Sequence, residues 1–152
     1  MSKLSLVFLS LLLGGAACEA ATAPGDHDNL IAARARWDAM SGPTYSSQVD
    51  RACECVLGGR AMTVTVSRGS VTAASYEDSG SAVDQALLAF VPTVPDLFDL
   101  IQDALDRKAA YLAVTYDPTY GYPTHIQIDY SVNAVDDEVR MNVRDLNFFA
   151  AE

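Results

Sequence analysis

The chain has 152 residues, half of them hydrophobic, which suits one globular domain with a core and excludes a disordered polymer. Acidic residues outnumber basic ones 20 to 10, so the formal net charge is −10. Because this charge repels phosphate backbones and anionic headgroups, we expect no nucleic-acid partner and no electrostatic docking on a membrane.

The N-terminus is typical of an export signal. Residues 1–3 give a positive start, Leu4–Leu13 is an apolar run broken by two serines, and residues 14–17 are small. Such a run is too short to span a bilayer but has the length of the apolar region of a secretory signal. We therefore expect residues 1–17 to be a signal peptide and the working protein to lie outside the cytoplasm.

Cys18 stands where a bacterial lipoprotein carries its acylated cysteine. Ala16 and Ala17 fit the residues before such a cysteine, whereas Gly15 replaces the usual large aliphatic residue. Two interpretations stay open. Acyl chains such as palmitate on Cys18 would anchor the domain to a membrane, or ordinary cleavage near Ala17 would leave it periplasmic or secreted. Glu19, in place of the retaining aspartate, favours the outer membrane or the cell surface.

Residues 18–27 are small and polar and predict a flexible tether, which leaves a single domain over residues 28–150. Apolar residues at helical spacing predict a helix over 28–40, with Asp28 as its cap and Trp37 in the core. A second helix is predicted over 94–108.

The second predicted helix opens with a capping box formed by Thr93 and Asp96. The segment 77–92 fits either a short helix or a loop. A change of parity after Arg144 predicts a bulge near Asp145. Alternation of apolar and polar residues predicts strands over 45–55, 62–67, 71–76, 111–116, 124–130 and 139–148. These elements predict an α+β fold, an antiparallel sheet of about five or six strands with one or two helices packed on one face.

Several stretches together resemble a known bacterial envelope family. The most specific is the YDPTYGYP sequence from Tyr116 to Pro123, accompanied by Trp37, Tyr45 and the Cys53-Glu54-Cys55 stretch. Over roughly residues 30–148 the chain resembles the family catalogued as domain of unknown function 6174, found mainly in bacterial lipoproteins. The resemblance implies an envelope location and a single module. It implies no established activity and therefore no catalytic residues.

Cys53 and Cys55 form a pair if Cys18 carries lipid, since an exported chain with three cysteines has one left over. In a flat strand, residues two apart have Cα atoms about 6.5–7 Å apart. This separation is near the limit for a disulfide, so a bond requires a local bend. We consider both a structural disulfide and a redox-active pair; the strand-like surroundings lack the helix N-terminus that lowers a thiol pKa.

The remaining candidate sites are a turn, an acidic group and two histidines. Neither His27 nor His125 belongs to a catalytic motif. The turn either covers a sheet edge or forms a recognition patch, and it comprises Tyr116, Asp117, Tyr120, Gly121, Tyr122 and Pro123. The acidic group is either a solvated loop or a weak Ca²⁺ site, and it comprises Asp129, Asp136, Asp137 and Glu138.

We expect a non-catalytic envelope protein with no cofactor and no metal, which binds an envelope protein or surface ligand. It would touch a membrane only through an acylated Cys18. Two alternatives stay open. One is a secreted enzyme or redox protein that uses Cys53 and Cys55, and the other is a calcium-stabilised structural module.

Overall fold

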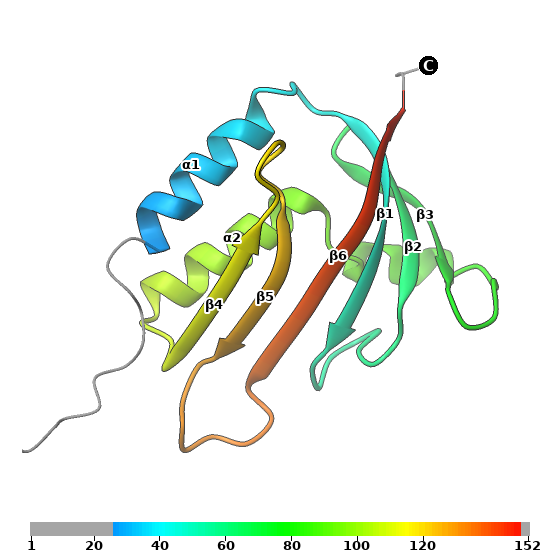
Figure 1. Cartoon of the computed structure of the whole chain (residues 1–152). Coiled ribbons are helices and arrows are strands. Elements are labelled where there is room, and N and C mark those ends of the chain that lie inside the picture. Colours follow the sequence, from blue (N-terminus) through cyan, green and yellow to red (C-terminus); the bar gives the residue numbers. More distant parts are fainter. Residues whose placement is uncertain (1–25, 150–152) are drawn as a thin grey trace, which may run out of the picture.

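The computed structural model describes residues 26–149. In chain order the elements are α1 (Asp26–Asp38), β1 (Thr44–Ala52), β2 (Met62–Ser67), β3 (Ser70–Tyr76), the short 3₁₀ helix η1 (Gln85–Phe90), α2 (Val94–Asp106), β4 (Tyr111–Tyr116), β5 (Pro123–Asp129) and β6 (Glu138–Phe149). The strands form one six-stranded antiparallel sheet in the order β3-β2-β1-β6-β5-β4, with α1 and α2 beside its β4–β5–β6 half (Figure 1). The α+β prediction is therefore confirmed.

Period-two alternation assigns one face of the sheet to the core. In β2, and in β1 as far as Val49, every second residue is buried. Tyr45 pairs with Val66 of β2 on one side and with Phe148 of β6 on the other, so apolar side chains line up across the strands. No element of the described chain covers the opposite face, which carries polar and charged side chains.

The bulge predicted near Asp145 is present in β6. Ser46 of β1 pairs with Asn147, and Gln48 pairs with Arg144, so two residues of β6 lie opposite one residue of β1. Asp145 has a φ of 51°, the left-handed conformation that such a bulge can require. The bulge brings Phe148 onto the core face, where it packs against Trp37.

Several predicted boundaries are corrected by the structure, and the larger shifts are these. The first helix spans Asp26–Asp38, so Asp28 lies in its first turn instead of capping it, and residues 26 and 27, expected in the tether, are helical. The second helix ends at Asp106 because Lys108 turns to a φ of 56°. The predicted strand over 45–55 ends at Ala52, where the chain bends. The predicted signal peptide and Cys18 lie outside the described residues.

The N-terminus of α2 is fixed by three polar contacts. Thr93 and Asp96 form the predicted capping box. The backbone N–H of Val94 donates to the hydroxyl of Tyr45, 2.9 Å away. Tyr45 is 2% exposed, so its hydroxyl satisfies a helix donor that water does not reach. This contact joins α2 to the central strand of the sheet.

An aromatic cluster holds α1 on the sheet. The ring of Trp37 lies 5.3 Å from the ring of Tyr45 and 6.3 Å from that of Tyr122, both edge-on. Its third neighbour is Phe148, at 6.2 Å. Trp37 is 3% exposed, as the sequence predicts for a core anchor. The cluster therefore connects α1, β1, β6 and the turn before β5.

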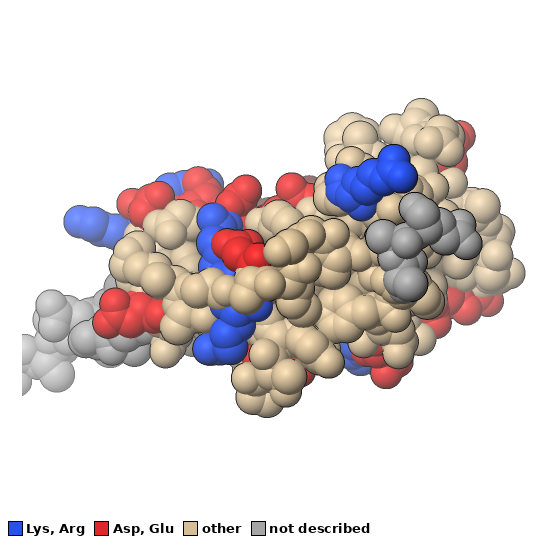
Figure 2. Space-filling model, turned by 90° about the horizontal axis from the view of Figure 1, so that it is seen from above, with Lys and Arg blue, Asp and Glu red and all other residues tan. Residues whose placement is uncertain are grey.

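The helices of the described chain are too short or too polar to cross a bilayer. The negative net charge does not gather into one patch on the face seen from above. Basic and acidic side chains lie there between broad uncharged areas (Figure 2).

Gly121 allows the turn before β5 to approach α1 closely. Its φ is +82°, and a Cβ at this position would lie 2.2 Å from the carbonyl oxygen of Ala33. We predict that Gly121→Ala lowers the free energy of unfolding by more than about 2 kcal/mol, because backbone strain of about 1–2 kcal/mol adds to the clash. Urea denaturation measures the difference. Gly69→Ala is the control: its φ is +75° with no atom near the new Cβ, so it should show the strain alone.

The burial of Tyr45 should make the stability of the fold depend on pH in the alkaline range. Burial is the main cause that raises the pKa of Tyr45 from 10 to about 12. The folded state therefore keeps the phenol neutral while the unfolded state ionises, so stability present below pH 10 is lost as the pH rises towards 12. Tyr45→Phe should lower the free energy of unfolding at pH 7 by about 1–3 kcal/mol, since the Val94 N–H loses its acceptor.

Urea denaturation from pH 7 to 11.5 checks this prediction. The loss of stability above pH 10 should be shallower in Tyr45→Phe than in the wild type. Some slope should persist, because burial also raises the pKa of Tyr116 and Tyr130 to about 12. Tyr111→Phe, at an exposed position, is the control and should change neither quantity. An equal effect of both substitutions would contradict the role of Tyr45.

Candidate functional site

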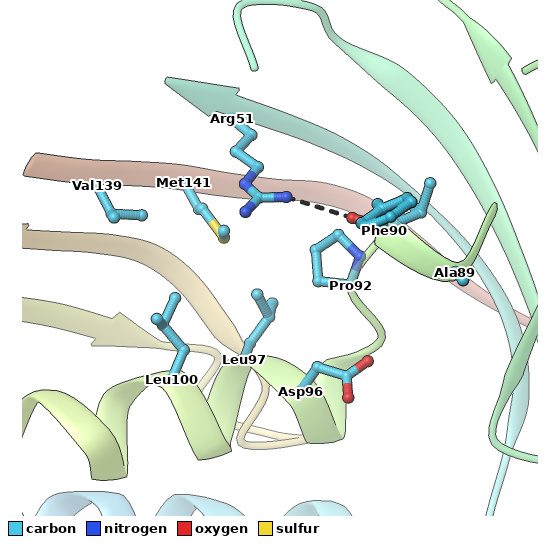
Figure 3. Close-up of a pocket in the computed structure, with 10 residues that line it drawn as sticks. Arg51, Ala89, Phe90, Pro92, Asp96, Leu97, Leu100, Val139 and Met141 are labelled. Atoms are coloured by element: carbon cyan, nitrogen blue, oxygen red, sulfur yellow. Dashed lines mark hydrogen bonds between the residues drawn. The ribbon is translucent and has the colours of Figure 1, made fainter. Parts of the chain in front are cut away.

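A cavity of about 280 Å³ lies between α2 and the core face of the sheet, at the end of β1 (Figure 3). One wall is the first turns of α2, the second is β1 with β6, and the third is the linker from η1 to α2. The lining is Arg51, Ala89, Phe90, Val91, Pro92, Asp96, Leu97, Leu100, Val139 and Met141. We call this cavity the Arg51 pocket.

Arg51 is the one cation in this lining, and the strand period places it there. It follows the buried residues Tyr45 and Val49 at the same parity, and it pairs with Met141 of β6. Its side chain therefore points to the helix-covered face. The guanidinium lies between Met141 and Pro92 (Figure 3).

The guanidinium of Arg51 is only partly satisfied. One terminal nitrogen, Nη1, donates to the carbonyl oxygen of Phe90 at 3.2 Å. Nε is buried and has no hydrogen-bond partner, and no carboxylate of the described chain pairs with Arg51. Burial lowers the pKa of Arg51, but an arginine stays charged at neutral pH. An unpaired buried donor of this kind costs about 1–3 kcal/mol or more.

Asp96, the other charged residue in the lining, does not neutralise Arg51. Its Oδ2 accepts hydrogen bonds from the backbone N–H and the hydroxyl of Thr93, at 2.8 and 2.6 Å. Its carboxylate points away from the guanidinium (Figure 3). The N–H of Val94 is bound by Tyr45, so the helix end offers no strong donor to compete with Arg51.

The arrangement is suited to holding a ligand. Its lining combines a guanidinium with an unused edge and a wall of aliphatic and aromatic side chains. It contains no serine, cysteine, histidine or lysine, and the one side chain in it that could act as a nucleophile or a general base is Asp96, whose Oδ2 is held by Thr93. Apolar cavities with one fixed polar group are typical of ligand sites.

Cys53 and Cys55 are joined by a disulfide, with Cα atoms 5.3 Å apart. This distance is shorter than in a flat strand, because the chain leaves β1 at Ala52 and bends, as the sequence required. Gly58 packs into the bend, where a Cβ would lie 2.3 Å from the carbonyl oxygen of Cys53.

The disulfide borders a shallow hollow with acidic walls. Glu54, Asp136 and Glu138 line it together with both cysteines. Negative neighbours disfavour the thiolate that redox exchange needs. The surroundings therefore favour the structural interpretation over the redox-active one.

The tyrosine-rich turn packs mostly against the protein itself. Tyr122 is buried, and Tyr116 stacks on Phe98 of α2 at 6.5 Å. The Oδ1 of Asp117 accepts the backbone N–H groups of the residues two and three positions later, which fixes the turn. Tyr120 is 40% exposed and leans on Phe148. These contacts give the turn a structural role, and its recognition role stays a prediction.

The four residues of the predicted acidic group do not converge. Asp129 pairs with Glu138 across β5 and β6, and its Oδ1 accepts the backbone N–H of Ser131. Asp136 and Glu138 line the hollow by the disulfide, and an oxygen of Asp137 is buried without a partner. Within residues 26–149, no three histidine, cysteine or acidic side chains are grouped as metal ligands would be.

His125 belongs to a polar row on the open face of the sheet. Its Nδ1 lies 2.7 Å from Oδ1 of Asn142, and Nδ2 of Asn142 donates to Asp50 at 2.8 Å. Asp50 also pairs with Arg144 at 3.4 Å. The row joins three strands. His27 lies in the first turns of α1, away from this row.

Sequence reasoning missed the Arg51 pocket. A signal was nevertheless present: Arg51 continues the parity of Tyr45, Ser47 and Val49, so a cation stands at a position that faces the core. The neighbours of Arg51 could not be predicted from the sequence. Leu97 and Met141 lie beside it only because of the strand order in the sheet and the position of α2.

Comparison with known proteins places the chain in a family. No curated protein matches it. Residues 29–148 match the profile described as a family of unknown function, DUF6174. The match spans the sheet and both α-helices, including β1, which carries Arg51, and the segment that forms the rest of the pocket. The chain therefore belongs to the DUF6174 family.

Proposed function

We propose that this chain is an exported protein of the cell envelope whose domain is a non-catalytic binding module, and that the Arg51 pocket is its binding site. One observation carries the proposal. The pocket holds a charged guanidinium, without an acidic partner in the described chain, against an apolar wall.

A structural role alone accounts poorly for this arginine. Arg51 is only partly buried, but its Nε is buried without a partner, which opposes folding, and an aliphatic side chain at the same position would avoid that cost. Departures from the rules of stable folding occur mainly at functional sites. Phe90, which also lines the pocket, is 52% exposed and gives the lining an aromatic ring that a ligand could contact.

The proposed location rests on the N-terminal sequence. An apolar run after Lys3, small residues up to Ala17 and a cysteine at position 18 fit an exported lipoprotein. A disulfide between Cys53 and Cys55 fits an oxidising compartment. The acyl chains on Cys18 would hold the binding module near a membrane.

The intact mass of the protein tests export and anchoring together. After expression of the full chain in a Gram-negative bacterium, we expect the mass of a chain that begins at Cys18, with added acyl groups and without the two hydrogens lost to the disulfide. Cys18→Ser is the control and should lack the acyl mass. A protein that keeps residues 1–17 would contradict export, and a cleaved chain without acyl groups would contradict the anchor.

Binding of a neutral apolar dye tests the pocket itself. We expect the fluorescence of N-phenyl-1-naphthylamine to rise when the folded protein is added, because the dye leaves water for an apolar cavity. Leu100→Glu should weaken this binding by at least about tenfold, since it places a charge in the wall. Ile31→Glu, at an exposed position of α1 outside the pocket, is the matched control and should bind as the wild type does. Equal binding by both variants would remove the pocket from the proposal.

A further inference from the structure

We infer that the ligand of the Arg51 pocket is an alkyl carboxylate of medium chain length, with its carboxylate on Arg51 and its chain against α2 and β6. This inference rests on the proposed binding function and goes beyond it by naming the chemical class of the ligand. Three observations carry it: the free edge of the guanidinium, the apolar wall, and the volume.

The free edge of Arg51 selects an anion with two oxygens. Nη1 donates to the carbonyl oxygen of Phe90, whereas Nη2 and Nε, which share the other edge, have no acceptor within residues 26–149. Because Nε is buried, a ligand reaches Nη2 first and contacts Nε only after the side chains that cover it shift. Two parallel N–H groups on one edge of a guanidinium match the two oxygens of a carboxylate. The carbonyl of Phe90 also holds the guanidinium in place, so little side-chain freedom is lost on binding.

The rest of the lining selects an apolar tail. Leu97 and Leu100 lie three residues apart and therefore share one face of α2. Val139 and Met141 lie at the same parity on β6 and form the facing wall. Besides Arg51, the only charged side chain in this lining is Asp96, whose carboxylate points away from the guanidinium (Figure 3). A polar tail would leave its hydrogen-bonding groups unpaired in this space.

The volume sets the length of the tail. A cavity of about 280 Å³ holds on the order of nine groups the size of a water molecule. This corresponds to an alkyl chain of roughly eight to ten carbons. The net charge of −10 disfavours anions at long range, but salt screens this repulsion beyond about 8 Å at physiological ionic strength, so the local guanidinium decides.

Displacement of N-phenyl-1-naphthylamine from the purified protein tests the inference. The competitors are decanoate, decan-1-ol, and a short apolar peptide with a free C-terminal carboxylate, each below its aggregation limit. We expect decanoate to displace the dye at a concentration at least about tenfold lower than decan-1-ol, because a charge-assisted pair on Arg51 adds to the apolar contact.

The variants assign the preference to Arg51. Arg51→Gln should bind decanoate and decan-1-ol equally, and Arg51→Lys should keep part of the preference, since it retains the charge without the paired N–H groups. Arg140→Gln is the matched control: it removes an arginine of β6 that is exposed and lies one residue from Met141, on the other face of the sheet. It should keep the full preference. Urea denaturation confirms that each variant is folded.

The outcomes separate this inference from the function on which it rests. If the dye binds but decanoate and decan-1-ol displace it equally, the pocket stands and the carboxylate ligand is overturned. If the peptide displaces the dye and decanoate does not, the ligand is a peptide terminus and the inference is overturned as well. If the dye does not bind the wild type, both the proposed binding site and the inferred ligand are overturned. A preference for decanoate that survives Arg51→Gln would also overturn the assignment.

Discussion

The pairing of β1 with β6 is the constraint on which the rest of the structure depends. β1 carries β2 and β3 on one side, and β6 carries β5 and β4 on the other, so the two halves of the sheet meet only at this pair. Its strands come from opposite ends of the described chain, and its formation closes a long loop. Tyr45 and Val49 then face Phe148 and Val143 on the core side, which gives both helices a surface to cover.

The same pairing builds the Arg51 pocket. Arg51 meets Met141 because the bulge at Asp145 and the register of β1 with β6 place them opposite each other. Tyr45, six residues earlier on the same face, holds the first turn of α2 and so positions Leu97 above the arginine. The site is therefore assembled from contacts that also stabilise the fold, while Arg51 itself adds an unpaired buried donor.

Local chemistry made much of this fold predictable from the sequence. Alternation located the strands, the Thr93–Asp96 pair located the start of α2, and a parity change located the bulge at Asp145. The predicted ends of elements were wrong where a strand or helix stops without a distinctive residue to mark it. One example is Ala52, where β1 ends and the chain bends towards the disulfide. The order of the strands could not be predicted, because no residue in or near β1 indicates that its partner strand lies some 90 residues further along the chain.

The candidate site was less predictable than the fold for the same reason. The features chosen from the sequence were conspicuous in composition, such as the tyrosines from Tyr116 to Tyr122, and packing accounts for most of those side chains. Arg51 was a single charge in an alternating strand, and its meaning depended on residues from three distant segments. The charged residue at a core-facing position of β1 therefore leads to the proposed pocket, whereas the aromatic residues at the turn lead to a packing contact.

The edge position of β4 has a consequence for the chain before it folds. Its sequence, Tyr111 to Tyr116, is uncharged and rich in residues that favour strands, and its outer edge pairs with no strand of the described sheet. A segment of this kind readily adds to the same segment of another molecule and starts aggregation. Arg107 and Lys108 on one side, with Asp117 and Pro118 on the other, are residues that interrupt such stacking. The sequence around β4 therefore limits association between copies as well as ending the strand.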